Sequence, residues 1–424
     1  MGTVLLWVAA TQAESLLEIL AETKPRAAEK AIRRALRDTD LSIDEWTEAI
    51  RRFTPPAPDV ADGPFEITLT LPGGRDWPCL VQMPKGYDHA KPTPLVIVLP
   101  GTGAEMEMMH ALWEPVAADS GFLFAFPKLL YVSTGWQFKA DEREVPPATL
   151  REMKRRFNVD EDRVFLTGVS KGGHASWDVG FRFPQLFAGI VPESGRMYNH
   201  GLPLTPRFDY LENGRDLSIY QLQGAKDHAP MVEALREGCR LLEEMGADVT
   251  YVELDDRGHG ASPDRYPDVL KWMSDRARTP LPKKSAVLCH DLAYGGRAWS
   301  RITKFEPGVV RENAPLILKK DYSGLIPDSE LEANEVRVFE SAAGLSVELT
   351  GENDVTVRAR NVERFTLRIS ADQFDLDKPI RVSVNGSRVH DKRVAASSET
   401  LLRGFWEDVD RPRLFVAELT LKVP

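Results

Sequence analysis

The chain has 424 residues, of which 42% are hydrophobic and 28% charged, and its formal net charge is -10. This is the composition of an ordinary globular protein, without the bias of disordered or collagen-like chains, and the length exceeds what one core usually organises. The acidic balance argues against nucleic-acid binding, because neutralising phosphates needs Lys and Arg clustered on one face.

Metal and cofactor signatures are missing from the sequence. The three cysteines, Cys79, Cys239 and Cys289, lie far apart with no CxxC spacing, so at most one disulfide could form. The eight histidines are scattered, and both the HExxH pattern and the EF-hand loop are absent. We therefore expect no metal and no cofactor. No apolar run reaches the length of a membrane span.

The first apolar segment, "VLLWVAATQA" at residues 4–13, has two interpretations. It resembles the remnant of a trimmed signal peptide, although no basic residue precedes it, or it forms the first turns of a helix that continues into "ESLLEILAET". The first interpretation implies a secreted or periplasmic protein. The second implies a cytoplasmic one.

Residues 14–53 have apolar side chains at helical spacing, with Pro25 as a break between two helices. The stretch "TPPAPDVADGP" from Thr54 to Pro64 holds four prolines and no periodicity, which is typical of a linker. We expect an N-terminal helical extension over residues 1–55 and a new unit that begins at residue 64.

From Phe65 onward, apolar strands alternate with amphipathic helices. The predicted strands cover residues 65–71, 79–84, 94–100, 121–127, 163–168, 188–194, 218–224 and 248–255, and the helices lie near 104–120, 147–157, after 172, 231–245 and 267–276. Nearly continuous apolar strands separated by helices indicate a mostly parallel sheet covered on both faces. The pattern predicts a doubly wound α/β domain over residues 64–279.

The proline-containing stretch "RTPLPKK" at residues 278–284 ends this alternation. Strands with alternating polarity follow at residues 335–341, 345–351, 354–360, 364–370, 380–386, 387–393 and 414–423, with turn signals at 352–354 and at Asn385-Gly386. We expect a separate, mostly antiparallel β domain over residues 285–424. A structural cap is the favoured role, and a module that tethers substrate is the alternative. Trp299 and Trp406 could stack on sugars, but aromatic residues at strand spacing more often belong to a core.

Ser170 lies between the strand "VFLTG" and a helical pattern, in the string Gly168-Val169-Ser170-Lys171-Gly172. A nucleophile elbow needs small residues two before and two after its serine, because the sharp turn presses the backbone against its neighbours. Gly173 adds further room. The alternative is a glycine-rich turn without catalytic function.

A nucleophilic serine needs a base and an orienting acid, in the chain order Ser, acid, His for such a sheet. His259 follows the strand "DVTYVELD" on a glycine-flanked loop, and Asp227 follows the preceding strand. The carboxyl ends of neighbouring strands meet at one edge, so these side chains should converge with Ser170. Asp255 and Asp256 compete for the role of acid but lie too near His259 along the chain to face its ring easily.

Acyl transfer also requires donors for the developing oxyanion. We expect the backbone N–H groups of Lys171, directly after the serine, and of Thr102, in the Gly101-Thr102-Gly103 turn after "PLVIVLP". That turn lacks the third glycine of the dinucleotide-binding pattern G-x-G-x-x-G.

Two long runs carry a resemblance to a known family: "PKGYDHAKPTPLVIVLPGTGAEMEMM" and "FNVDEDRVFLTGVSKGGHASWDVGFRFPQLFAGIVPESG", followed by "QGAKDH" and "GHG". Residues 65–278 resemble serine esterases of the α/β-hydrolase superfamily, and are most similar to its poly(3-hydroxybutyrate) depolymerase, feruloyl esterase and dienelactone hydrolase branches. The resemblance implies Ser170 as nucleophile, His259 as base, Asp227 as acid, and Thr102 and Lys171 as oxyanion donors. One departure is Pro100 before Gly101, where the family usually has histidine.

The expected function is cleavage of carboxylic esters through an acyl-enzyme, with a small-molecule or polymer-borne ester as substrate. Trp136 and Phe138, in the segment from Tyr131 to Leu150, could line the substrate site or pack beneath the loop. A serine peptidase of the prolyl-peptidase-like branch and a non-catalytic binding protein with a hydrolase fold are the alternatives.

Overall fold

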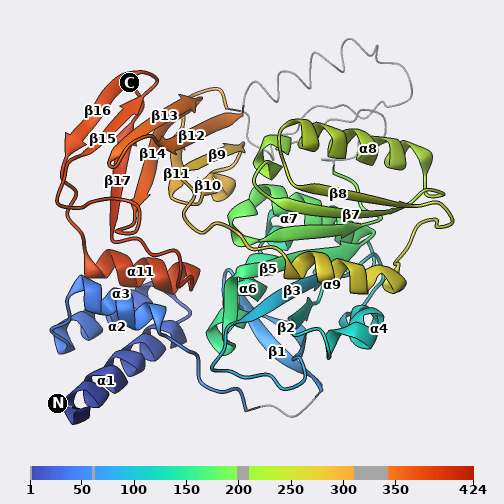
Figure 1. Ribbon diagram of the computed structural model, residues 1–424, viewed down its shortest axis with the longest axis horizontal. Coiled ribbons are helices and arrows are strands. Elements are labelled where there is room, and N and C mark those ends of the chain that lie inside the picture. Colours follow the sequence, from blue (N-terminus) through green and yellow to red (C-terminus); the bar gives the residue numbers. More distant parts are fainter. Residues whose placement is uncertain (1, 60–62, 198–209, 310–341) are drawn as a thin grey trace.

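The computed structural model describes residues 2–59, 63–197, 210–309 and 342–424, with side chains described from residue 12 onward. Three regions follow one another along the chain: N-terminal helices, a central sheet covered by helices, and C-terminal sheets (Figure 1). Within these ranges, every helix is too short or too polar to cross a membrane.

The central sheet has eight strands in the order β1-β2-β4-β3-β5-β6-β7-β8. β2 is antiparallel to both of its neighbours, β1 and β4, and the strands β3 to β8 are parallel to one another. The strands are β1 Pro64–Leu71, β2 Arg75–Gln82, β3 Thr93–Leu99, β4 Leu123–Pro127, β5 Val159–Val169, β6 Gly189–Glu193, β7 Ser218–Gly224 and β8 Val249–Leu254. The carboxyl ends of β3 to β8 therefore meet at a single edge.

Helices cover both faces of this sheet, because its strands are apolar on both sides. The helices α4 (Met106–Ala117) and α9 (Tyr266–Ser274) pack on one face, and α6 (Val145–Arg156), α7 (Lys171–Arg182) and α8 (Ala229–Glu244) pack on the other. The fold class predicted from the sequence is thereby confirmed. A one-turn helix, α5 (Ala140–Arg143), was not predicted.

Three helices precede the sheet: α1 (Gly2–Ala21), α2 (Pro25–Asp38) and α3 (Ile43–Arg51). Pro25 begins α2, as its missing N–H and fixed φ favour at a helix start. The third helix was not predicted separately. Its signal is a capping box, in which Ser42 and Glu45 each bond the backbone N–H of the other.

The N-terminal helices share a core with the end of the chain. Leu16, Ile32, Trp46 and Phe53 are buried against Leu401, Leu402 and Phe405 of α11 (Ser398–Asp408). Figure 1 shows α1 to α3, in blue, directly beside α11, in red. The indole N–H of Trp406 donates to the carbonyl of Glu22 at 2.7 Å, which ties the two regions together. The sequence analysis did not predict α11.

The C-terminal region contains two sheets around one apolar core, with the orders β10-β11-β14-β17 and β16-β15-β13-β12-β9. The strands are β9 Lys284–Cys289, β10 Gly296–Arg297, β11 Ser300–Phe305, β12 Ala343–Leu349, β13 Asp354–Arg360, β14 Val362–Ile369, β15 Ile380–Val384, β16 Ser387–Lys392 and β17 Ala417–Lys422. Pairing is antiparallel except between β13 and β15. The strand predicted at 335–341 lies outside the described residues.

Two details of the C-terminal region follow directly from residue type. Asn385 and Gly386 both have positive φ, 49° and 88°, as a two-residue hairpin between twisted strands requires. Trp299 is completely buried, and its indole donates to the carbonyl of Pro282 at 2.7 Å. Trp299 therefore belongs to the core and presents no surface on which a sugar could stack.

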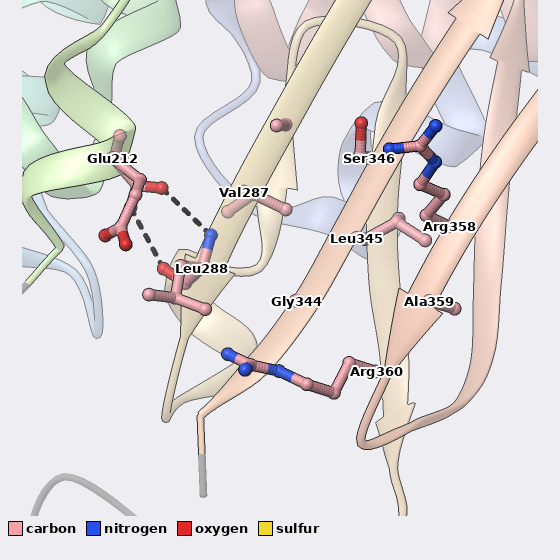
Figure 2. Close-up of a pocket in the computed structure, with 11 residues that line it drawn as sticks. Glu212, Val287, Leu288, Gly344, Leu345, Ser346, Arg358, Ala359 and Arg360 are labelled. Carbon is pink, nitrogen blue, oxygen red and sulfur yellow. Dashed lines mark hydrogen bonds between the residues drawn. The ribbon is translucent and has the colours of Figure 1, made fainter. Parts of the chain in front are cut away.

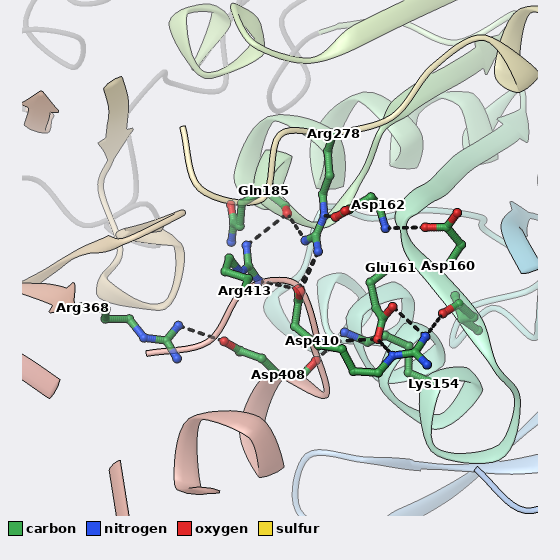
Figure 3. Close-up of polar contacts among 12 residues, drawn as sticks. Lys154, Asp160, Glu161, Asp162, Gln185, Arg278, Arg368, Asp408, Asp410 and Arg413 are labelled. Carbon is green, nitrogen blue, oxygen red and sulfur yellow. Dashed lines mark hydrogen bonds and ion pairs between the residues drawn. The ribbon is translucent and has the colours of Figure 1, made fainter. Parts of the chain in front are cut away.

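A buried network of charges joins the C-terminal region to the central sheet (Figure 3). The guanidinium of Arg278 donates to both oxygens of Asp410, at 2.7 and 2.8 Å, and to Asp162 at 3.0 Å. Arg413 pairs with the same Asp410 carboxylate at 3.1 Å. The Asp410 side chain is 1% exposed and that of Arg278 is 7% exposed. Burial alone would raise the pKa of Asp410, but the charges of Arg278, Arg413 and Lys154 hold it well below its usual value.

Replacing Asp410 with Asn should lower the free energy of unfolding by about 3–5 kcal/mol, because the buried Arg413 would lose its paired carboxylate and the buried Arg278 would keep only Asp162. Chemical denaturation of the two proteins measures this difference. The control is Asp391→Asn, which removes an exposed partner of Arg388 and should cost less than about 1 kcal/mol. Equal losses of unfolding free energy in the two variants would show that the buried network does not stabilise the contact between the two regions.

Candidate active site

Ser170 occupies a sharp turn between β5 and α7, with φ of 57° and ψ of -117°. Positive φ is strained for a residue with a side chain, so neighbouring contacts must hold the turn. Those contacts are close: a Cβ at Gly172 would overlap the carbonyl of Leu99, and one at Gly168 would lie 2.6 Å from the same oxygen. The glycines two before and two after the serine are therefore required by space.

The three residues predicted to form a catalytic triad are brought together in one hydrogen-bonded line. His259 Nε2 lies 2.8 Å from Ser170 Oγ, and His259 Nδ1 lies 2.8 Å from Asp227 Oδ2. Ser170 follows β5, Asp227 follows β7 and His259 follows β8, so each side chain comes from the carboxyl end of a different strand. Asp256, the rival acid, faces Arg257 at 3.6 Å.

Asp227 is held by three donors in addition to its burial. The backbone N–H of His228 donates to Oδ1 at 2.7 Å, and the amide of Gln223 donates to Oδ2 at 3.0 Å. Burial alone would raise the pKa of Asp227, but the hydrogen bonds from His259, His228 and Gln223 outweigh it, so this pKa lies below its ordinary value. The Asp227 side chain is 5% exposed and that of His259 is 48% exposed. Asp227 is therefore ionised at neutral pH behind an accessible imidazole.

The turn that contains Thr102 lies directly against the serine. Residues Leu99 and Gly168 are paired across β3 and β5, and a Cβ on Gly101 would lie 3.6 Å from that of Ser170. The N–H of Gly103 donates to the carbonyl of Val132 at 2.7 Å. The segment after β4 thus braces this turn. Thr102 and Lys171 remain predicted oxyanion donors.

The two aromatic candidates for the substrate site have different surroundings. Trp136 is 1% exposed, and its indole donates to Asp178 at 3.0 Å, beneath the surface. This favours the packing alternative for Trp136. Phe138 is half-buried, with its ring centroid 5.7 Å from Lys171 Nζ and 6.2 Å from the ring of His174. Phe138 therefore lies beside the serine turn, residues 168–172.

His174 supports the same turn from the helix side. Its Nδ1 lies 2.7 Å from the carbonyl oxygen of Ser170, and burial lowers its pKa to about 4. The ring is therefore neutral at physiological pH and donates its Nδ1 proton to that carbonyl. Glu193, the last residue of β6, contacts both the serine turn and the histidine loop, which we define as residues 255–262 after β8. Ser194, directly after it, contacts Gly260 in the same loop. Sequence analysis missed both residues.

Figure 2 shows a separate hollow where the central region meets the C-terminal sheet. It has a volume of about 280 Å³, and Glu212, Leu288, Gly344, Arg358 and Arg360 are among its lining residues. The predicted site residues do not line it. Among the described residues, no group of three or more His, Cys, Asp or Glu side chains is arranged to hold a metal ion.

The strand order and the sequence Ser, Asp, His at the ends of β5, β7 and β8 define the α/β-hydrolase fold. A comparison with known proteins also finds a similarity to an esterase. Over 171 residues the chain is 27% identical to "Putative esterase NocK" of Nocardia uniformis subsp. tsuyamanensis, covering 35% of this chain and 47% of that protein. The chain thus spans about half the length of this curated relative. No protein-family model matches the sequence.

Solved structures of esterases are similar to about half of this chain. A thermostable esterase matches 51% of this chain and 63% of its own, with 21% identity and a TM-score of 0.42. A ferulic acid esterase matches 50% of this chain and 97% of its own, with 15% identity and a TM-score of 0.41. The curated relative, which is itself described as an esterase, supports the resemblance stated from the sequence.

Replacing Gly172 with Ala should lower the free energy of unfolding by about 3 kcal/mol, the upper end of ordinary overpacking costs, because the new methyl would overlap the Leu99 carbonyl. Thermal and denaturant unfolding measure the change. The matched control is Gly344→Ala in β12, where the nearest atom would be 3.5 Å away. A tolerated Gly172→Ala would contradict the tight turn.

Proposed function

We propose that this protein is a serine hydrolase that cleaves carboxylic esters through an acyl-enzyme. The hydrogen-bonded line from Asp227 through His259 to Ser170 is the observation that carries the proposal. An ionised Asp227 fixes the tautomer of His259 with the proton on Nδ1, which leaves the Nε2 lone pair facing the serine hydroxyl.

The geometry supports a two-step reaction. Ser170 Oγ attacks the ester carbonyl while His259 Nε2 takes its proton, and the N–H groups of Thr102 and Lys171 receive the developing oxyanion. His259 then gives the proton to the leaving alcohol. In the second step His259 takes a proton from water, which attacks the acyl-enzyme, and returns it to Ser170.

Esters are proposed as the substrate class because the curated relative is described as an esterase. The segment from Tyr131 to Leu150 supports a small or polymer-borne ester over an emulsified lipid. Arg143 within it donates to the buried Asp178 at 2.8 Å, so the segment is anchored in the protein interior and is no long apolar lid. Phe138 is the proposed wall for the acyl or aryl group.

Ser170→Ala should lower kcat by about 10⁶-fold and Asp227→Asn by about 10⁴-fold, because the first removes the nucleophile and the second the ionised partner of His259. Hydrolysis of short-chain p-nitrophenyl esters measures both, with a feruloyl ester, a hydroxybutyrate oligomer and a peptide amide in parallel. The substrate ranking distinguishes esterase branches from a peptidase.

A fluorophosphonate probe tests the alternative that the protein has a hydrolase fold but no catalytic activity. Wild type should be labelled covalently at Ser170, and Ser170→Ala should not be labelled. If Ser170→Ala hydrolyses esters as fast as wild type, or if folded wild type resists the probe, the proposed function is wrong.

A further inference from the structure

The end of β6 lies between the strands that carry Ser170 and Asp227. Its last residue, Glu193, is 3% exposed, and the following Ser194 is 2% exposed. A carboxylic acid so deeply buried is costly unless its oxygens are hydrogen-bonded, so its partners indicate its purpose.

Glu193 contacts both halves of the proposed active site. Its backbone carbonyl accepts a hydrogen bond from the N–H of Ser170 at 2.8 Å. Its carboxylate accepts from the backbone N–H of Ser262 through Oε1 and from the hydroxyl of Tyr266 through Oε2 at 3.1 Å. Ser262 lies three residues after His259, and Tyr266 begins α9. Glu193 thus bridges the serine turn and the histidine loop.

Ser194 adds a second attachment to the same loop. Its hydroxyl donates to the carbonyl of Gly260 at 3.0 Å and accepts from the N–H of Gly260 at 3.3 Å. Ser194 has φ of 47°, so its backbone is strained in a position where its hydroxyl reaches the residue directly after His259.

The histidine loop needs such attachments because its own sequence provides little rigidity. His259 is flanked by Gly258 and Gly260, and Gly260 has φ of 149°. On the side before His259, the N–H of Lys226 donates to the carbonyl of Arg257 at 2.8 Å. On the side after it, the attachments are those to Glu193 and Ser194.

Burial raises the pKa of Glu193 to about 7, against the hydrogen bonds from Ser262 and Tyr266, and the negative charge of Asp264 adds to the rise. Asp264 also lies 3.1 Å from Arg257 and 3.8 Å from Arg265. Tyr266, whose own pKa is raised by burial and by Glu193, stays a neutral donor. Glu193 therefore changes charge near neutral pH, while Tyr266 does not.

We infer that Glu193 is a positioning residue: in its ionised form it accepts from Ser262 and Tyr266 and thereby holds His259 within hydrogen-bonding distance of Ser170. The inference rests on the proposed function, since it acts through the proposed base. An ionised carboxylate accepts through both oxygens, whereas a protonated one must direct its own O–H away from donors.

The test is Glu193→Gln, which keeps the size of the side chain and can still accept from Ser262. At pH 8 kcat should fall about tenfold with KM changed less than twofold, because a misplaced base slows chemistry and not binding. In wild type, log kcat/KM should fall more steeply on the acid side than in the variant, because protonation of Glu193 below a pH of about 7 removes an acceptor for Ser262 and Tyr266. The variant should lack this additional steepness.

Stability distinguishes positioning from a merely structural role. A carboxyl whose pKa is raised on folding contributes stability below its unfolded pKa, and that contribution is lost as the pH rises through the folded value of about 7. Glu193→Gln should therefore unfold at an equal or higher temperature than wild type at pH 8, although its activity is lower. A structural role would lower both.

Two further variants serve as controls. Glu161→Gln removes a buried carboxylate that pairs with Arg411 at 2.6 Å, near the end of β5 opposite to Ser170. It should lower the unfolding temperature without changing the fall of kcat/KM on the acid side. Tyr266→Phe removes one donor to Glu193, and the ring can keep its stack on Trp113 at 3.9 Å. Its kcat should fall about threefold, a partial effect.

The inference is overturned if Glu193→Gln has the kcat and pH profile of wild type while Ser170→Ala is inactive. If instead Ser170→Ala is fully active, the proposed function itself fails. A readout independent of turnover is the downfield NMR resonance of the His259 Nδ1 proton shared with Asp227. It should be sharp in wild type at pH 8 and broadened in Glu193→Gln, and an unchanged resonance would overturn the inference even if none of the tested esters is hydrolysed.

Discussion

The positive φ of Ser170 is the constraint on which the arrangement of the site depends. Such a conformation costs about 1–3 kcal/mol for a residue with a side chain, so it persists only where the surroundings determine it completely. Here the backbone of α7 is pressed against β3 at Gly172 and against the end of β6 at Gly173. The same closeness brings Gly101, Glu193 and the serine N–H within reach of one another. The strained backbone of Ser170 and the convergence of the site residues around it therefore both result from this close packing.

Much of this arrangement could be predicted from local sequence. Ser170, Asp227 and His259 each follow an apolar strand, and parallel strands place such positions at one edge. Glu193 is the last residue of a strand, but "AGIVPES" continues a buried run without a glycine-flanked loop, so nothing in the sequence distinguished its carboxylate from an ordinary strand end. Its importance depends on Ser262 and Tyr266, which are about seventy residues away in the sequence. Contacts between residues so far apart along the chain produce no periodic pattern in the sequence.

Other differences between prediction and structure have the same origin. The helix α11 was overlooked because strands surround it in the sequence, and its apolar face is completed by the distant helices α1 to α3. Trp136, in a loop, was considered for the substrate site. Its burial is set by Asp178 and by the ion pairs of Arg143 and Arg182 with that carboxylate, a network assembled from separate segments. Residue type predicts the partner a side chain needs, but not which segment supplies it.

The shared core of the N-terminal helices and α11 has a consequence for synthesis on the ribosome. The helices α1 to α3 are translated before the central sheet, whereas their apolar partners Leu401, Leu402 and Phe405 are translated after it. At elongation rates of about 5–20 residues per second, the helices wait roughly 20–70 s for α11. During that interval the buried faces of Ile32, Trp46 and Ile50 are open to chaperones. The central sheet, whose strands are contiguous in sequence, can complete its own core first.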